Sequence, residues 1–149
     1  MSKIWSSSNK VLVVVSYTNT EALNNYLDAL KKLGLNIFEC VILAIVDNKE
    51  QKKYLFAKGS VIYFSEEEID FFRRNKNEIV KKVLADTYDL QIVIGDFSKK
   101  LKRQIIKTKV KMRIGINTKE NFFDINLLSK NETPSHLINF AKEIVDKIS

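Results

Sequence analysis

The chain has 149 residues and a formal net charge of +7, from 25 basic and 18 acidic side chains. A hydrophobic content of 45%, with four glycines and one proline, excludes a disordered, collagen-like or linker-like chain. The single cysteine, Cys40, excludes an internal disulfide, and the single histidine, His136, excludes a histidine-rich metal site.

Residues 1–10 predict a polar tail, and residues 11–149 predict one α/β domain. The tail carries Ile4 and Trp5 but lacks the apolar segment of a secretory signal. The longest apolar runs fall far short of the ~20 residues that cross a bilayer. We therefore expect no membrane span and a cytoplasmic location, to which the lone cysteine also points.

Runs of apolar and β-branched residues predict six buried strands. They cover residues 11–17, 37–46, 61–64, 90–94, 112–116 and 122–128. Apolar residues at helical spacing predict helices at about residues 18–33, 65–72, 76–85, 98–108 and 133–148. Thr18 and Ser65 each precede a glutamate by three residues, which is the spacing of a capping box at a helix start.

Strands that alternate with helices predict an α/β fold, a three-layer Rossmann-like sandwich. Right-handed crossovers in two windings give a mostly parallel six-stranded sheet of order 3-2-1-4-5-6. Only residues 117–121 separate the last two predicted strands. Since a parallel crossover normally needs a dozen or more residues, we expect an antiparallel edge strand.

The second half of the chain contains three short motifs: YDLQIVIGDF at residues 88–97, TKVKMRIGI at 108–116 and FFDINLL at 122–128. With the apolar C-terminal helix, they resemble a Bacteroidetes family of uncharacterised proteins, a domain of unknown function. In that family a YD-L-I strand is followed by a short helix, an AK-K-VG strand and a second YD-L-I strand. The resemblance covers about residues 11–148 and implies a small bacterial Rossmann-like protein without a known activity.

The layout is also distantly similar to the acceptor-binding half of heptosyltransferase-like glycosyltransferases. Those enzymes need a second Rossmann-like half for the nucleotide sugar, for which this chain has no room. The similarity would imply half an enzyme without its donor site, and likeness of fold alone does not supply a function.

In such folds, ligands bind beyond the carboxyl ends of the strands, at the switch point between the first and fourth strands. The side chains expected there are Ser16, Thr18, Asn19, Thr20, Asp47, Asp96 and Ser98. They would suit a sugar phosphate or a nucleotide, but caps and turns need the same residue types. The chain has neither a G-x-G-x-x-G motif nor a P-loop, so no cofactor is predicted.

The positive charge is concentrated in residues 99–113, which hold eight basic side chains and no acid. The candidate anion-binding residues in this segment are Lys99, Lys100, Lys102, Arg103 and Arg113. Binding to nucleic acid phosphates is one interpretation, and a solvated helix face beside a lysine-protected edge strand is the other. No aromatic residue lies within the segment, so base stacking is not predicted. We expect Phe71 and Phe72 to serve core and edge packing rather than a binding surface.

No catalytic constellation is recognisable, and we expect Cys40 to be a buried structural residue. The leading hypothesis is therefore a non-catalytic protein that binds an unknown protein partner or a second copy of itself, for which Trp5 or an edge strand is a candidate contact. A small-molecule binder or enzyme at the switch point is the alternative. Nucleic acid binding through residues 99–113 is a second alternative.

Overall fold

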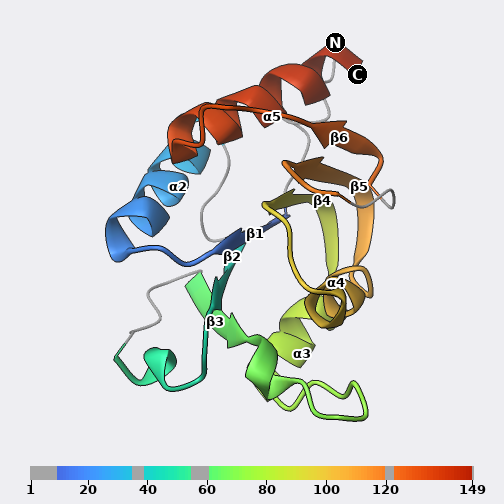
Figure 1. Ribbon diagram of the computed structural model, residues 1–149. Helices are drawn as coiled ribbons and strands as arrows, with labels where there is room; N and C mark the ends of the chain where they lie inside the picture. The colour runs from blue at the N-terminus through green and yellow to red at the C-terminus, as the bar shows by residue number, and fades with distance from the viewer. Residues whose placement is uncertain (1–9, 35–38, 55–60, 120–122, 149) are drawn as a thin grey trace.

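The computed structural model describes residues 10–34, 39–54, 61–119 and 123–148 (Figure 1). Apart from Lys10, the predicted tail with Trp5 lies outside the described residues, as do parts of the second and sixth predicted strands. Among the described helices, none combines the length and the apolar character that crossing a bilayer requires.

The protein is built on one six-stranded sheet in the order β3-β2-β1-β4-β5-β6. The strands are β1 (Val11–Ser16), β2 (Cys40–Val46), β3 (Val61–Ser65), β4 (Thr87–Ile94), β5 (Lys109–Ile116) and β6 (Ile125–Leu127). All five neighbouring pairs are parallel. The predicted α/β fold and strand order are confirmed, and the switch point lies between β1 and β4.

Helices cover both faces of the sheet, which explains why its strands are continuously apolar. They are α2 (Thr20–Lys32), α3 (Glu78–Ala85), α4 (Lys99–Ile105) and α5 (Pro134–Ile148), with short 3-10 turns η1 (Gln51–Tyr54) and η2 (Glu66–Glu68). Val11, Val13 and Val15 of β1 are buried in one core cluster with residues of α2 and α5. Leu12 and Val14 are buried in a second cluster with residues of α3 and α4 (Figure 1).

The expected antiparallel edge strand is wrong, because β6 pairs with β5 in the parallel direction. Thr118 and Phe123 of the connection lie over Gly115 of β5, and its described residues, 117–119 and 123–124, form no helix. A Cβ atom on Gly115 would lie 2.5 Å from Thr118 Oγ1 and 2.8 Å from the ring of Phe123. Glycine at this position thus lets the chain pass close to the sheet, so that β6 can begin parallel to β5 after a short connection.

The helix starts differ from expectation at one of the two predicted capping boxes. Asn19, rather than Thr18, caps α2, because its Oδ1 accepts a hydrogen bond from the backbone N–H of Ala22 at 2.7 Å. The Ser65 box is present, but it opens only the turn η2. The expected helix at residues 65–72 is therefore wrong beyond Glu68, where the chain leaves helical geometry.

Candidate anion-binding site

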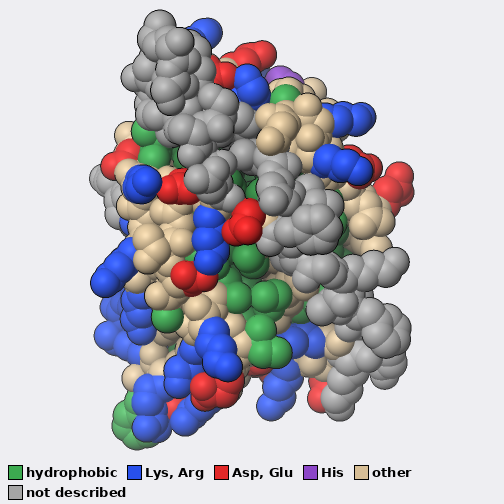
Figure 2. Space-filling model, turned by 180° about the vertical axis from the view of Figure 1, so that it is seen from behind, with side chains coloured by type: hydrophobic (Ala, Val, Ile, Leu, Met, Phe, Trp, Pro, Cys, Tyr) green, Lys and Arg blue, Asp and Glu red, His purple; other side chains and the backbone are tan. Residues whose placement is uncertain are grey.

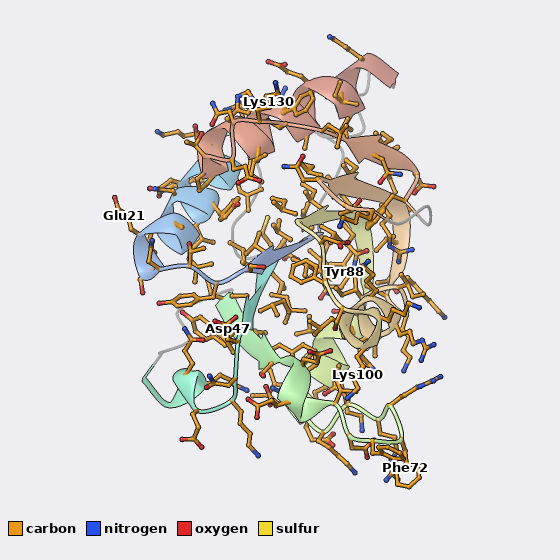
Figure 3. All side chains as sticks on the ribbon, viewed as in Figure 1. Glu21, Asp47, Phe72, Tyr88, Lys100 and Lys130 are labelled. Carbon is orange, nitrogen blue, oxygen red and sulfur yellow. The ribbon has the colours of Figure 1, made fainter. Side chains whose placement is uncertain are left out.

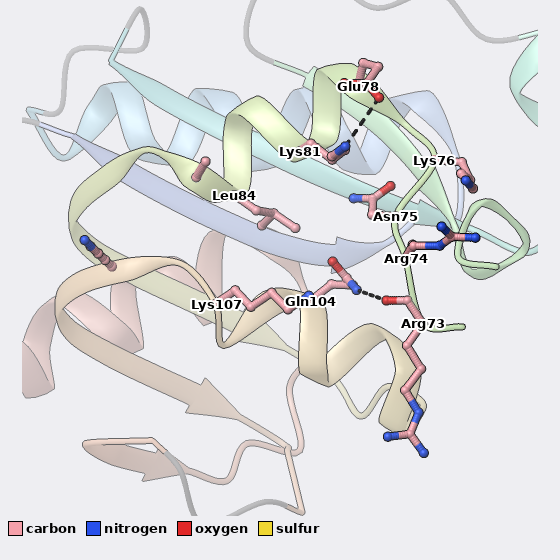
Figure 4. A pocket seen from close by; sticks show the side chains of 11 residues that line it. Arg73, Arg74, Asn75, Lys76, Glu78, Lys81, Leu84, Gln104 and Lys107 are labelled. Atoms are coloured by element: carbon pink, nitrogen blue, oxygen red, sulfur yellow. Dashed lines mark hydrogen bonds and ion pairs between the residues drawn. The ribbon is translucent and has the colours of Figure 1, made fainter. Parts of the chain in front are cut away.

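A groove of about 750 Å³ lies between α3 and α4 on one face of the sheet (Figure 4). The loop before α3, the two helices and the start of β5 supply its lining. Six basic side chains contribute to it, namely Arg73, Arg74, Lys76, Lys81, Lys107 and Lys109. Glu78 is the one acidic residue among the described lining residues. The groove therefore carries a strong excess of positive charge.

The loop before α3 is held in a fixed shape. Ile69 and Asn75 pair as an antiparallel bridge at its base. Inside the loop, the Asp70 carboxylate accepts hydrogen bonds from the Arg74 backbone N–H at 2.8 Å and from Arg74 Nε at 2.9 Å. The backbone bond, followed by the side-chain bond, holds the pKa of Asp70 below its usual value. Asp70 thus ties the loop together as a charged group.

Gln104 of α4 joins the two sides of the groove. Its side chain is buried, and its Nε2 donates a hydrogen bond to the Arg73 carbonyl at 3.1 Å (Figure 4). Arg73 has a φ of 66°, which is unusual for a residue with a side chain. The bond from α4 therefore helps to keep the Arg73 backbone in this conformation at the rim.

Asn75 offers the groove a donor that the protein itself does not use. The residue is only 7% exposed, and its Oδ1 accepts a hydrogen bond from the Asn77 backbone N–H at 2.8 Å. Its Nδ2 has no acceptor within the described chain, and Figure 4 shows it directed toward the space between α3 and α4. A buried donor without an acceptor costs about 1–3 kcal/mol. An acceptor atom at the inner end of the groove would remove that cost.

Half of the basic side chains are balanced by nearby acids. Asp70 lies 2.9 Å from Arg74 and 3.5 Å from Lys76, and Glu78 lies 3.4 Å from Lys81.

For the other three, Arg73, Lys107 and Lys109, no carboxylate of the described residues lies within ion-pairing distance. Their charge is available to an external anion.

A shallower pocket adjoins the groove on the outer side of α4. Lys100, Arg103 and Ile106 line it, together with Arg73, Gln104 and Lys107, which also line the groove. Because they share these three residues, the groove and the shallow pocket lie next to each other. In Figure 2, Lys and Arg side chains gather over this part of the molecule. The basic surface is therefore long enough for more than one anionic group.

The structure divides the five predicted anion-binding residues into two groups. Lys100 and Arg103 line the shallow pocket, and Lys99 is exposed on the first turn of α4 without lining either hollow. Lys102 is mostly buried and forms an ion pair with Asp96 at 2.9 Å. Arg113 also points inward.

Arg113 connects α4 to the sheet. Its Nε donates to Gln91 Oε1, and its Nη2 donates to the Thr108 carbonyl at 2.7 Å. Gln91 Nε2 in turn donates to the Ile105 carbonyl at 3.4 Å. Burial lowers the pKa of the Arg113 guanidinium, because it removes water from around the charged group. The hydrogen bonds to Gln91 and Thr108 take the place of bonds to water. We interpret Arg113 as a structural residue.

The predicted switch-point residues mainly hold the loops of the protein. Ser98 caps α4, since its Oγ accepts from the Leu101 backbone N–H at 3.3 Å. Asp96 follows Gly95 and pairs with Lys102, whose hydrogen bond holds the pKa of Asp96 below its usual value, with a smaller effect from the Lys119 backbone.

The remaining predicted residues lie at the same edge of the sheet, in the segments that follow β1 and β2, and their described hydrogen bonds are local. Ser16, Thr18 and Thr20 are exposed around the end of β1, and Thr20 Oγ1 lies 3.4 Å from the Tyr17 hydroxyl. The Asp47 backbone N–H donates to Gln51 Oε1 at 3.2 Å in a turn after β2. With Asn19 capping α2, these contacts are those of caps and turns.

Metal and thiol chemistry find little support in the described residues. They contain no group of three or more His, Cys, Asp or Glu side chains that would hold a metal ion. Cys40 is buried in β2, and burial raises its pKa to about 11. The thiolate that a nucleophile requires is therefore scarce at neutral pH.

Sequence reasoning missed the basic residues that precede and follow the start of α3. The signal was present as two arginines and a lysine at Arg73, Arg74 and Lys76, directly after the point where the helical pattern breaks. These residues are separated in sequence from the basic segment 99–113 by the whole of α3 and β4, and only the packing of α3 and α4 into one core cluster brings the two together.

Fold and groove together define a doubly wound α/β protein with a basic groove between the two helices of one face. The chain belongs to a family of unknown function (DUF6913), which matches residues 2–147. No curated protein and no solved structure matches the chain. The predicted membership of a family of unknown function is confirmed, and the activity has to be inferred from the site.

Proposed function

We propose that this protein is a non-catalytic binding protein whose α3–α4 groove takes up a phosphate-bearing polyanion. The observation that carries the proposal is a groove lined by six basic side chains and one acid, with three of the cations free of described carboxylates. Phosphate groups satisfy both requirements of such a site, because they supply negative charge and several hydrogen-bond acceptors.

A polyanion fits better than a single small anion. The groove and the shallow pocket share Arg73, Gln104 and Lys107, so the charged surface continues across α4. Each phosphate that meets a lysine or arginine releases counterions, and the gain adds up along the ligand. A ligand with several phosphates therefore uses the whole surface.

Binding is favoured over catalysis by the chemistry of the groove. Its described lining consists of cations, amides, apolar side chains and one acid, Glu78, which is already paired with Lys81. General acid–base catalysis needs a titratable group within reach of a reacting proton. The described lining holds no imidazole, no thiol and no unpaired carboxylate for that role.

The location and the domain organisation are part of the same proposal. We take residues 11–149 as one domain, and we place the protein in the bacterial cytoplasm, where a free buried thiol such as Cys40 is stable. A self-associated form would be compatible with the groove, because neither edge strand, β3 or β6, contributes to its described lining. The distant similarity to glycosyltransferases supports no part of the proposal.

Fluorescence anisotropy with end-labelled inorganic polyphosphate tests the proposal. We expect binding at low salt that weakens steeply as salt is raised. Lys107→Glu with Lys109→Glu should lower the affinity about tenfold or more, because it reverses two exposed charges at the groove.

The matched control reverses two exposed lysines elsewhere, Lys31 at the end of α2 and Lys130 before α5 (Figure 3). Lys31→Glu with Lys130→Glu changes the net charge equally and should lower the affinity much less. An equal loss in both double variants would contradict a specific site, and so would an absence of binding to the unaltered protein.

A further inference from the structure

We propose that the polyanion is a single-stranded nucleic acid, whose bases stack on Phe71 and Phe72 while its phosphates lie along the α3–α4 groove. This inference rests on the proposed function and adds the class of ligand. Its basis is the juxtaposition of two exposed aromatic rings with the rim of a basic groove.

The two phenylalanines are exposed, which does not agree with the expected core and edge packing. Phe71 is 89% exposed and Phe72 is 73% exposed. Their ring centroids lie 5.6 Å apart in an edge-to-face arrangement, so the two rings present differently oriented surfaces to the solvent. Exposing two adjacent apolar rings to water is unfavourable, and a flat apolar ligand that covered them would remove this surface from water.

The rings stand on a loop that is already ordered. Asp70 holds the Arg74 backbone, and the Arg74 guanidinium lies 5.2 Å from the centroid of the Phe72 ring as a cation–π pair. Gln104 fixes the Arg73 carbonyl from the other side. Ordering the loop before binding lowers the entropy lost when a ligand arrives.

The sequence of the loop places the rings at the rim of the groove. Arg73 and Arg74 follow Phe72 directly, and both line the groove. Figure 3 shows Phe72 at the outer end of this loop, beyond α3 and α4. A ligand whose phosphates reach Arg73 therefore has its neighbouring groups within reach of the rings.

A single strand is the polyanion that uses both features at once. Its bases are unpaired and stack on aromatic side chains, while its backbone follows a positively charged groove. In a duplex the bases are stacked inside, and polyphosphate has no bases. An anionic membrane would engage the two rings, but a flat bilayer leaves a groove of about 750 Å³ and the buried Asn75 amide unfilled.

The experiment measures anisotropy with labelled oligo-dT and oligo-U of about a dozen nucleotides, beside polyphosphate and a duplex of equal length. We expect the single strands to bind more tightly than the duplex. Phe71→Ala with Phe72→Ala should weaken single-strand binding about tenfold or more, because stacking contributes about 1–3 kcal/mol per base. The same variant should change polyphosphate binding less than about twofold, since the charges remain.

Two further variants separate stacking from other effects. Phe71→Leu with Phe72→Leu keeps the apolar character and should lose most of the single-strand affinity, because leucine has no aromatic face. Leu128→Ala removes another exposed apolar side chain, which directly follows the edge strand β6, and should have no effect. We expect all these variants to fold, because the replaced side chains are exposed, and circular dichroism would check this.

The possible results distinguish this inference from the proposed function. Polyphosphate binding that depends on Lys107, with single strands bound no better than the duplex and no effect of the phenylalanines, would overturn the inference and leave the proposed function standing. Binding to phosphatidylglycerol vesicles through the phenylalanines, with none to single strands, would overturn it in favour of a membrane surface. If the unaltered protein bound neither polyphosphate nor single strands, both this inference and the proposed function would be overturned.

Discussion

Arg73 has a backbone conformation that arginine rarely adopts. Its φ of 66° lies in the left-handed region, which costs a residue with a Cβ atom about 1–2 kcal/mol and which glycine adopts freely. Strain of this kind persists where the surrounding structure enforces it, and it is common at functional sites. The guanidinium at the rim of the groove gives a reason for arginine at this position.

Replacing Arg73 by glycine should therefore separate binding from stability. We expect the free energy of unfolding to stay within about 1 kcal/mol, because the relief of strain offsets the greater freedom of glycine in the unfolded chain. Polyphosphate affinity should fall several-fold, because one unpaired cation is lost. Urea denaturation and anisotropy measure the two effects. A large loss of stability with unchanged affinity would assign Arg73 a structural role instead.

Asp96 provides a pH-dependent test of its structural role. The hydrogen bond from Lys102 holds its pKa below the usual 3.8. Because the folded pKa is the lower one, the stabilising contribution is present above pH 3.8 and is lost as the pH falls through the folded value. Asp96→Asn should thus lower the free energy of unfolding by up to about 1 kcal/mol at neutral pH and have little effect in strong acid.

Urea denaturation of Asp96→Asn at both pH values checks this expectation. A difference that is the same in acid as at neutral pH would show that the ion pair does not stabilise the fold. Polyphosphate binding should be unchanged at neutral pH, because Asp96 lines neither of the two basic hollows.

Single residues were predictable where the determinants are local. The Ser65 capping box follows from its spacing to Glu68, and both bonds of the box are present. The choice of Asn19 over Thr18 at the start of α2 was not predictable, since both are good caps and they are adjacent. The inward role of Arg113 was also hidden, because its Gln91 partner is 22 residues away in the sequence.

At the scale of elements, the return of the chain from β5 to β6 depends on one glycine. Gly115 faces Thr118 and Phe123, and a Cβ atom there would come within 3.0 Å of both. This contact decides the direction of β6, because the segment needs room to cross the strand before β6 begins.

Gly115→Ala should therefore destabilise the protein by about 1–3 kcal/mol, the usual effect of overpacking. Phe123→Ala should also destabilise it, since a buried ring is lost. The double variant should be less destabilised than the sum of the two, because the smaller residue at position 123 makes room for the new methyl group. Thermal or urea denaturation of the four proteins gives this coupling, and strict additivity would contradict the proposed contact.

Most elements were predictable because their patterns are strong. The β-branched runs and helical stripes place the six strands in the correct order, as right-handed crossovers require. The loop before α3 was not predictable, because Ile69 and Phe72 match a helical spacing that Asp70 and the Ile69–Asn75 bridge override. The predicted antiparallel direction of β6 was wrong because a connection that crosses over a glycine can be shorter than the usual helical crossover.

At the scale of the whole molecule, packing redistributes the charge that the sequence places in residues 99–113. Lys102 and Arg113 turn inward to Asp96 and Gln91. The loop and helix before β4 replace them with basic residues on the same face. Lys100, Arg103, Lys107 and Lys109 of that segment line the two basic hollows. The groove itself could not be predicted from the sequence, because it forms only when α3 and α4 pack beside each other.

Amide-resolved NMR would locate the bound ligand on the protein residue by residue. We would titrate isotope-labelled protein with oligo-dT and follow the backbone amides together with the side-chain amides of Asn75 and Gln104. We expect shifts at Asn75, Gln104 and the residues around Arg73 and Lys107. Shifts confined to the loops of residues 16–20 and 95–98 would contradict it, because they would place the ligand at the switch point of the sheet.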